Sequence, residues 1–233
     1  MSEKTSKVWV RITAAAGSVL IVLAIAVACI SGAAFDKSFY RNEYTVTDTA
    51  AYVGVSESTL VRATDTLLDY LQGKTPSLDL KTEQNEEYYN EREKAHMTDV
   101  RALYQNAITF MTVGFCVGGA LIVLCFVWKK KGALCPVLQS FFWSTIGVLA
   151  CFAGIGIYAA VDFNNFWVGF HHVFFTNDLW LLDPAVSRMI RMFPENLFAD
   201  MVAGILAWFL SIVLGSAAAV GIVHKRMKKH ERS

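Results

Sequence analysis

Four long, uncharged and mostly apolar runs are separated by polar segments along the 233-residue chain. Each run holds more than 20 residues, and about 20 mainly apolar residues are enough for a helix to cross the hydrocarbon core of a bilayer. Because backbone groups in lipid must bond to each other, these runs should be helices. The pattern predicts an all-α integral membrane protein, with a single membrane domain over residues 1–233. Its transmembrane helices are expected at about residues 12–35, 104–128, 136–160 and 201–223.

Lysine and arginine gather in three short segments: the N-terminus, residues 129–131 and the C-terminal tail. In a protein with four spans these segments lie on the same side of the membrane, and the positive-inside rule makes that side the cytoplasm. We therefore expect both termini to be cytoplasmic. Residues 36–101 and 162–200 then form a small, mostly helical extracytoplasmic cap, where chemistry outside the lipid would take place.

The cysteines indicate no cross-links. All five fall in or beside the predicted spans, and no Cys-x-x-Cys spacing occurs. A disulfide framework and a cysteine-based metal site are therefore not expected. We also expect no cofactor and no nucleic-acid partner. The first apolar run is longer than the core of a cleaved signal peptide and other spans follow it, so we expect it to remain as an anchor.

Shorter elements are expected within the cap. A leucine stripe over residues 56–72, followed by Gly73, predicts a helix. Residues 39–46 alternate enough to predict a short strand or extended piece. The charged stretch 85–101 is helix-prone and should run directly into the second span, and residues 186–192 have the pattern of a short amphipathic helix.

Three of the five histidines, His96, His171 and His172, map to the outer rim of the predicted membrane region. Histidine exchanges protons near neutral pH, which makes these three the candidates for chemistry. His96 shares one face of its expected helix with Arg92 and Asp99. A carboxylate at this spacing can hold one imidazole nitrogen and leave the other free for proton transfer. The alternative is a row of surface ion pairs, which contributes little.

The second cap segment surrounds the adjacent His171 and His172 with seven aromatic residues between positions 163 and 180. Two adjacent residues on a helix cannot point the same way, and the richer aromatic setting favours His171. Asn177 and Asp178 follow closely enough to orient either ring. The alternative explanation is an aromatic belt on a re-entrant or interfacial helix, because aromatic rings favour headgroup depth.

Three strings of residues resemble one family. They are Asn-Glu-Arg-Glu-Lys-Ala-His-Met-Thr-Asp-Val-Arg at 90–101, Phe-His-x-x-Phe-Phe at 170–175, and Asn-Asp-Leu-Trp at 177–180 followed by Asp183-Pro184. Together with four spans under a cap, they resemble the lipoprotein intramolecular transacylases of the bacterial cell membrane. The resemblance covers nearly the whole chain. It aligns one catalytic histidine with His96.

The same resemblance aligns the second catalytic histidine with His171, although the doubled histidine leaves His172 open. It implies transfer of the sn-2 acyl chain of a diacylated lipoprotein to the α-amino group of its N-terminal cysteine, which gives a lyso-form lipoprotein. One histidine would act as base and the other as acid. Arg92, Asn177 or a backbone N–H would stabilise the oxyanion.

The expected contacts to the substrate come from aromatic and polar residues around these histidines, in a setting that excludes water and meets membrane lipid. They are Arg92, Asp99, Trp167, Phe170, Phe174, Phe175, Asn177, Asp178 and Trp180.

The sequence also bears on other functions. No Gly-x-Ser-x-Gly, Walker or His-Glu-x-x-His motif occurs, which weakens hydrolase, ATPase and metalloprotease hypotheses. Transport is disfavoured because charged residues are missing from the span interiors. The main alternative is a non-enzymatic membrane subunit or sensor whose cap binds a partner, and a second is a haem protein with His96 and His171 or His172 as axial ligands. The sequence leaves the base, the preferred lipoproteins and the oligomeric state open.

Overall fold

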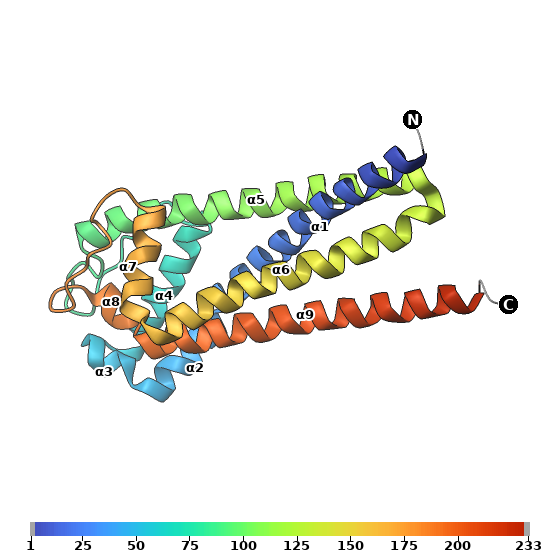
Figure 1. Cartoon of the computed structure of the whole chain (residues 1–233). Helices are drawn as coiled ribbons and strands as arrows, with labels where there is room; N and C mark the ends of the chain where they lie inside the picture. The colour runs from blue at the N-terminus through green and yellow to red at the C-terminus, as the bar shows by residue number, and fades with distance from the viewer. Residues whose placement is uncertain (1–2, 231–233) are drawn as a thin grey trace. The chain divides into compact units, whose positions relative to one another are not determined.

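The computed structural model describes residues 3–230, with the side chains of 3–6, 130–131, 195, 213, 217 and 219–230 left out. Within this part every named element is a helix, the segments 72–90 and 175–187 are irregular, and the only extended pairing is an isolated bridge between Lys81 and Glu87 (Figure 1). The elements are α1 Glu3–Ala34, α2 Lys37–Thr47, α3 Thr49–Val53, α4 Glu57–Leu71, α5 Glu91–Lys129, the 3₁₀ helix η1 Lys130–Ala133, α6 Leu134–Val161, α7 Phe163–Phe174, α8 Arg188–Met192 and α9 Glu195–His230.

Four helices, α1, α5, α6 and α9, are long and apolar enough to cross a membrane. The predicted all-α class with four spans is therefore confirmed. The positions of the membrane boundaries along each helix remain predictions. The first turns of α5, residues 91–101, carry six charged side chains, so we assign only the apolar part that follows them to the membrane.

The chain divides into two compact units. We call Met1–Cys29, Ile108–Phe163 and Leu206–Ser233 the membrane unit, because it holds most of the four apolar runs. We call Ile30–Ala107 and Asn164–Ile205 the site unit, because it holds all of the candidate site residues.

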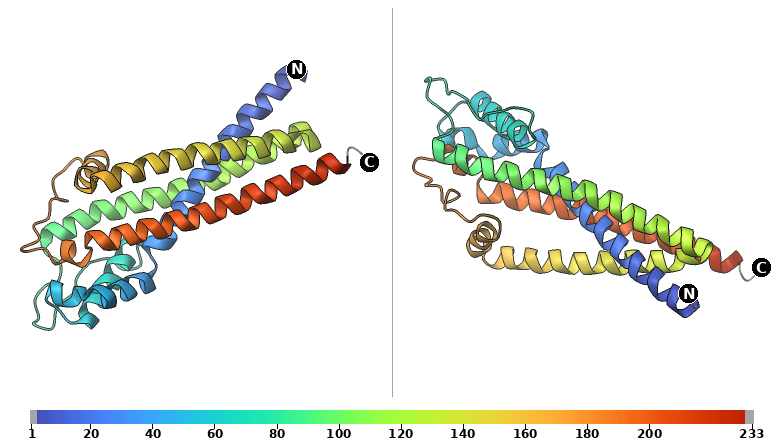
Figure 2. Two further views of the ribbon diagram at one scale, coloured as in Figure 1. Left: turned by 60° about the horizontal axis from the view of Figure 1, so that its bottom comes forward. Right: turned by 90° about the horizontal axis from the view of Figure 1, so that it is seen from above.

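Within the membrane unit, α1 and α5 pack closely at glycines. A Cβ atom added to Gly118 of α5 would lie 2.9 Å from the backbone oxygen of Gly17 of α1 and 2.8 Å from Cγ1 of Ile21. Small residues allow this approach, which is a common way for helices to associate in membranes. Both views in Figure 2 show α1 running across α5. Further along the same pair of helices, the Cys125 thiol lies 3.6 Å from the carbonyl oxygen of Val10.

The three basic segments of the sequence lie at one end of the membrane unit. The start of α1, the η1 turn and the end of α9 are found together at the right of Figure 1 and again in Figure 2. This arrangement is the one that four antiparallel spans require.

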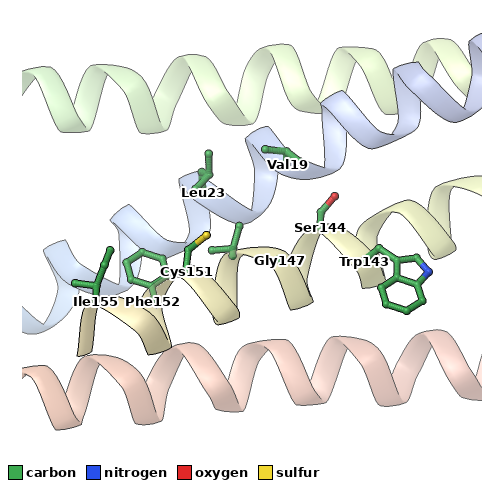
Figure 3. A pocket seen from close by; sticks show the side chains of 9 residues that line it. Val19, Leu23, Trp143, Ser144, Gly147, Cys151, Phe152 and Ile155 are labelled. Atoms are coloured by element: carbon green, nitrogen blue, oxygen red, sulfur yellow. The ribbon is translucent and has the colours of Figure 1, made fainter. Parts of the chain in front are cut away.

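An apolar cavity of about 600 Å³ lies between α1 and α6 in the membrane unit. Val19 and Leu23 of α1 face residues 143–155 of α6 across it (Figure 3). Its lining contains one hydroxyl group, Ser144, and one thiol, Cys151, but no histidine or carboxyl group. This cavity therefore lacks a residue suited to acid–base chemistry near neutral pH, and the candidate chemistry belongs to the site unit.

The site unit is built around its own apolar core. Leu60, Ala63 and Leu67 of α4 are buried there with Tyr89 and Met192. Ser56 caps the start of α4 by accepting a hydrogen bond from the Thr59 amide at 3.1 Å, and Gly73, with φ of +79°, lies just beyond its end. Such caps satisfy terminal backbone groups that the helix leaves unpaired. The helix predicted at 56–72 is confirmed.

Two of the shorter elements differ from the prediction. Residues 39–46 are helical and belong to α2, which begins where Asp36 accepts a hydrogen bond from the Ser38 amide at 2.9 Å. Tyr40 and Tyr44 are both buried one turn apart, so the aromatic pattern that suggested a strand is one face of a helix. The helix expected from residue 85 begins only at Glu91: Asn85 has a positive φ of 65°, and the Asn90 side chain caps the helix by accepting a hydrogen bond from the Glu93 backbone N–H. The short helix expected at 186–192 is present as α8.

The glycine contact in the membrane unit gives a test of this packing. Changing Gly118 to Ala should lower the free energy of unfolding by about 1–3 kcal/mol, because the added methyl group overpacks a backbone contact. Gly119 is the matched control, since a Cβ atom there meets nothing within 4 Å. Thermal unfolding in detergent compares the two variants, and equal stability would contradict the close approach of α1 and α5.

Candidate active site

His96 lies on α5, one turn after the start of the helix, and its side chain is only 5% exposed. Its Nδ1 atom has no hydrogen-bond partner among the described residues. Asp99, one turn further on, accepts a hydrogen bond from the side-chain Nδ2 of Asn177 at 2.9 Å and makes none with His96. The expected Asp99–His96 hydrogen bond is therefore wrong, because the carboxyl group faces the segment after α7.

His171 lies near the end of α7 and is 4% exposed. Its Nδ1 atom is 2.7 Å from the carbonyl oxygen of Trp167, one turn earlier. A carbonyl oxygen only accepts, so Nδ1 carries the proton and Nε2 of the neutral ring keeps a lone pair. His172 is exposed and its ring lies edge-on to Trp180 at 5.3 Å. The adjacent histidines thus occupy different environments.

The structure brings His96 and His171 together. Their ring centroids are 5.9 Å apart, and Phe175 lies against both, at 5.2 Å from His96 and 5.6 Å from His171. Trp167 and Trp180 each lie 4.6 Å from His171, Trp167 edge-on and Trp180 stacked. The pair is therefore enclosed by aromatic rings that exclude water from much of its surface.

Burial keeps both histidines neutral. The pKa of His96 is lowered to about 4, mainly by burial and also by the neighbouring His171 and Arg92, while Asp99 opposes the shift. Burial also lowers the pKa of His171, and its hydrogen bond to the Trp167 carbonyl partly opposes this effect. At neutral pH each ring can therefore accept a proton, as a general base requires.

Arg92 and Asp99, on either side of His96 along α5, hold the irregular segment after α7. Arg92 donates from Nε to the carbonyl oxygen of Leu181 at 3.2 Å and from Nη2 to the carbonyl oxygen of Asp178. Asp99 holds Asn177, whose own side-chain oxygen accepts a hydrogen bond from the Leu179 amide at 3.0 Å. These contacts fix the segment after α7, so in the structure Arg92 and Asp99 have a structural role.

Sequence reasoning missed Glu93, a fully buried residue on the first turn of α5. Its carboxyl oxygens accept hydrogen bonds from the Ser187 hydroxyl at 2.5 Å, the Met189 amide at 2.9 Å and the Asn90 amide at 2.7 Å. Asn90 in turn accepts one from the Glu93 amide at 2.9 Å. This reciprocal pair is a capping box, whose signal in the sequence is the Asn-x-x-Glu spacing before a helix.

The remaining residues that were expected to contact the substrate differ in their distance from the histidine pair and in their exposure. Phe170 lies 5.5 Å from His171, whereas the side chain of Phe174 is half exposed and packs on Phe170. The Asp178 side chain is exposed. No group of metal-binding side chains occurs among the residues that were described.

The model of the lipoprotein intramolecular transacylase Lit matches residues 15–198. The chain belongs to the lipoprotein intramolecular transacylase family. It is therefore a membrane acyltransferase that acts on lipoproteins, which favours the enzyme over the non-enzymatic subunit or sensor.

Solved structures agree on the fold. The chain is similar to the membrane integral transacylase Lit from Bacillus cereus, with a TM-score of 0.68 and 18% identity over 99% of each chain. A variant of that Bacillus cereus protein, with one histidine replaced by alanine, gives a TM-score of 0.69 at 17% identity, over 97% of this chain and 96% of that one. No curated protein matches the sequence.

The buried, neutral state of His96 predicts how stability depends on pH. The unfolded chain binds a proton at His96 below about pH 6.5, whereas the folded chain does so only near pH 4. The unfolded state therefore holds more protons between these values, so the free energy of unfolding falls as the pH falls. The loss reaches about 3 kcal/mol near the lower limit.

Thermal unfolding of the purified protein between pH 7 and pH 5 measures this effect. Wild type and the exposed-site control His172→Gln should both lose stability as the pH falls, and His96→Gln should lose less. An identical pH dependence in all three would contradict a buried neutral His96.

Proposed function

We propose that this transacylase acts on a diacylated lipoprotein, with His171 as general base and His96 as general acid. The α-amino group of the N-terminal cysteine attacks the carbonyl carbon of the sn-2 ester. A new C–N bond forms, and the bond between that carbon and the glycerol oxygen breaks. The proton lost by the amine ends on the glycerol oxygen, so the step needs no co-reactant.

The observation that carries this proposal is the buried pair of neutral imidazoles with His171 held in one tautomer. Nε2 of His171 keeps its lone pair because Nδ1 donates to the Trp167 carbonyl. His96 is the second proton carrier, and its Nδ1 has no partner in the protein. His171 passes the proton that it takes from the amine to His96, which becomes the acid by receiving it and then gives it to the glycerol oxygen, so both rings end the cycle neutral as they began.

Physical reasoning supports a site of this kind for an intramolecular transfer. Both reacting groups are on one molecule, so holding amine and ester together supplies a large part of the rate, about 7–11 kcal/mol in favourable cases. The aromatic rings around His171 disfavour water, which would otherwise compete with the amine for the ester carbonyl. A buried neutral base also avoids the loss of reactivity that protonation brings.

The proposal includes a place in the cell. We place the protein in the bacterial cell membrane with both termini in the cytoplasm and with residues 36–101 and 162–200 on the outer side. The basic segments at the start of α1, at the η1 turn and in the tail support this orientation. The lipid-anchored cysteine of a bacterial lipoprotein would then reach the site from the outer leaflet.

Expression in a bacterium that makes diacylated lipoproteins tests the assignment. Mass spectrometry of the N-terminal peptide of one abundant lipoprotein should show one acyl chain moved from glycerol to the amine. His96→Gln and His171→Gln should each lower conversion by at least about 10²-fold, since each removes acid–base help.

His172→Gln is the discriminating variant, because this exposed neighbour lies outside the buried pair. It should convert the lipoprotein as wild type does. Loss of activity in His172→Gln with retention in His171→Gln would reverse the assignment, and an unaltered lipoprotein with well-expressed wild type would overturn the proposed function.

A further inference from the structure

Attack on an ester carbonyl places negative charge on its oxygen, so a hydrogen-bond donor fixed near that oxygen accelerates the step. The sequence left Arg92, Asn177 and backbone N–H groups as candidates for this role. Both side chains are exposed. Their hydrogen bonds run to Asp178, Leu181 and Asp99 within the protein. Neither presents a buried donor to the histidine pair.

Trp180 does present one. Its side chain is 7% exposed, and its ring stacks on that of His171 at 4.6 Å with an angle of 26° between the planes. The indole Nε1 is buried and has no hydrogen-bond partner among the described residues. An indole N–H only donates, and native proteins rarely leave a buried donor without a ligand or a water molecule.

A second buried polar atom, on another ring that contacts His171, also lacks a partner among the described residues. Four buried side-chain polar atoms in the described part of the chain lack a partner, and the two in the site unit are Trp180 Nε1 and His96 Nδ1. Both belong to rings in contact with His171. Unsatisfied polar atoms gathered around one histidine indicate that a polar ligand completes their hydrogen bonds.

The position of Trp180 is set from α5. Arg92 donates hydrogen bonds to the carbonyl oxygens of Asp178 and Leu181, so it holds the backbone on both sides of Trp180. A donor held in this way needs no rearrangement when charge develops, which is the condition for strong electrostatic stabilisation of a transition state.

We propose that Trp180 is a catalytic residue whose Nε1–H donates a hydrogen bond to the carbonyl oxygen of the reacting sn-2 ester. This inference rests on the proposed function. The indole proton is not transferred at any stage. The hydrogen bond strengthens as the carbonyl oxygen gains charge during amine attack, and it weakens again when the bond to the glycerol oxygen breaks.

The test removes the N–H group and keeps the shape of the ring. Trp180 is replaced by 3-benzothienylalanine, in which sulfur takes the place of the indole N–H, and the Trp180→Phe variant is made in parallel. Purified proteins are assayed on a synthetic peptide with an S-diacylglyceryl cysteine, over a range of pH. The same isosteric replacement at Trp208, which is exposed on α9, is the matched control.

The proposal expects kcat to fall by about 10²- to 10³-fold in both Trp180 variants, with an unchanged pH profile and an unaffected Trp208 control. Activity of the isosteric variant within about threefold of wild type would overturn it, and would mean that Nε1 has only a water partner. A fall in kcat with a shifted pH profile would also overturn it, because the ring would then act by placing His171.

The proposed function and the role of Trp180 can be rejected separately. An inactive wild type on the diacylated peptide rejects the proposed function itself. An active wild type with an active isosteric variant rejects only the role of Trp180.

Discussion

The buried carboxyl group of Glu93 is the contact on which the rest of the site unit depends. It accepts hydrogen bonds from Ser187 and Met189 at the start of α8 and from its own capping partner Asn90. Leaving such a buried acceptor unpaired costs about 1–3 kcal/mol. The first turns of α5 therefore carry a contact that fixes α8, contacts that fix the segment before it, and the histidine itself.

This arrangement explains how an irregular segment can support chemistry that needs fixed geometry. The chain between α7 and α8 has no helix of its own, so its carbonyl groups accept hydrogen bonds partly from within the segment and partly from α5. Arg92 donates hydrogen bonds to two of these carbonyl groups, and the Asp99 carboxylate accepts one from the Asn177 side chain. Trp180 is thereby kept stacked on His171, and the aromatic enclosure that lowers the pKa of both histidines is maintained. Burial therefore both keeps the two histidine rings neutral and excludes water from the site.

Sequence patterns predicted those features that depend on residues close together along the chain. Uncharged runs of more than 20 residues specify the four apolar helices, and the Ser56 cap with the leucine stripe specifies α4. The strand expected at 39–46 was wrong because buried Tyr40 and Tyr44 are one helical turn apart. The partner of Asp99 and the role of Glu93 depend on contacts between residues 78 and 96 positions apart. The spacing of residues along α5 alone does not predict these long-range contacts.

The central claim is that a neutral histidine pair moves an acyl chain within one lipoprotein molecule, and a crossover experiment tests it most directly. Purified enzyme would receive two diacylated lipopeptides together, one with an isotope-labelled peptide and the other with an isotope-labelled sn-2 chain. The account predicts that mass spectrometry finds N-acylated products carrying one label or the other, never both or neither, and that His96→Gln and His171→Gln give none. Doubly labelled product, or release of the labelled chain as free fatty acid, would contradict it.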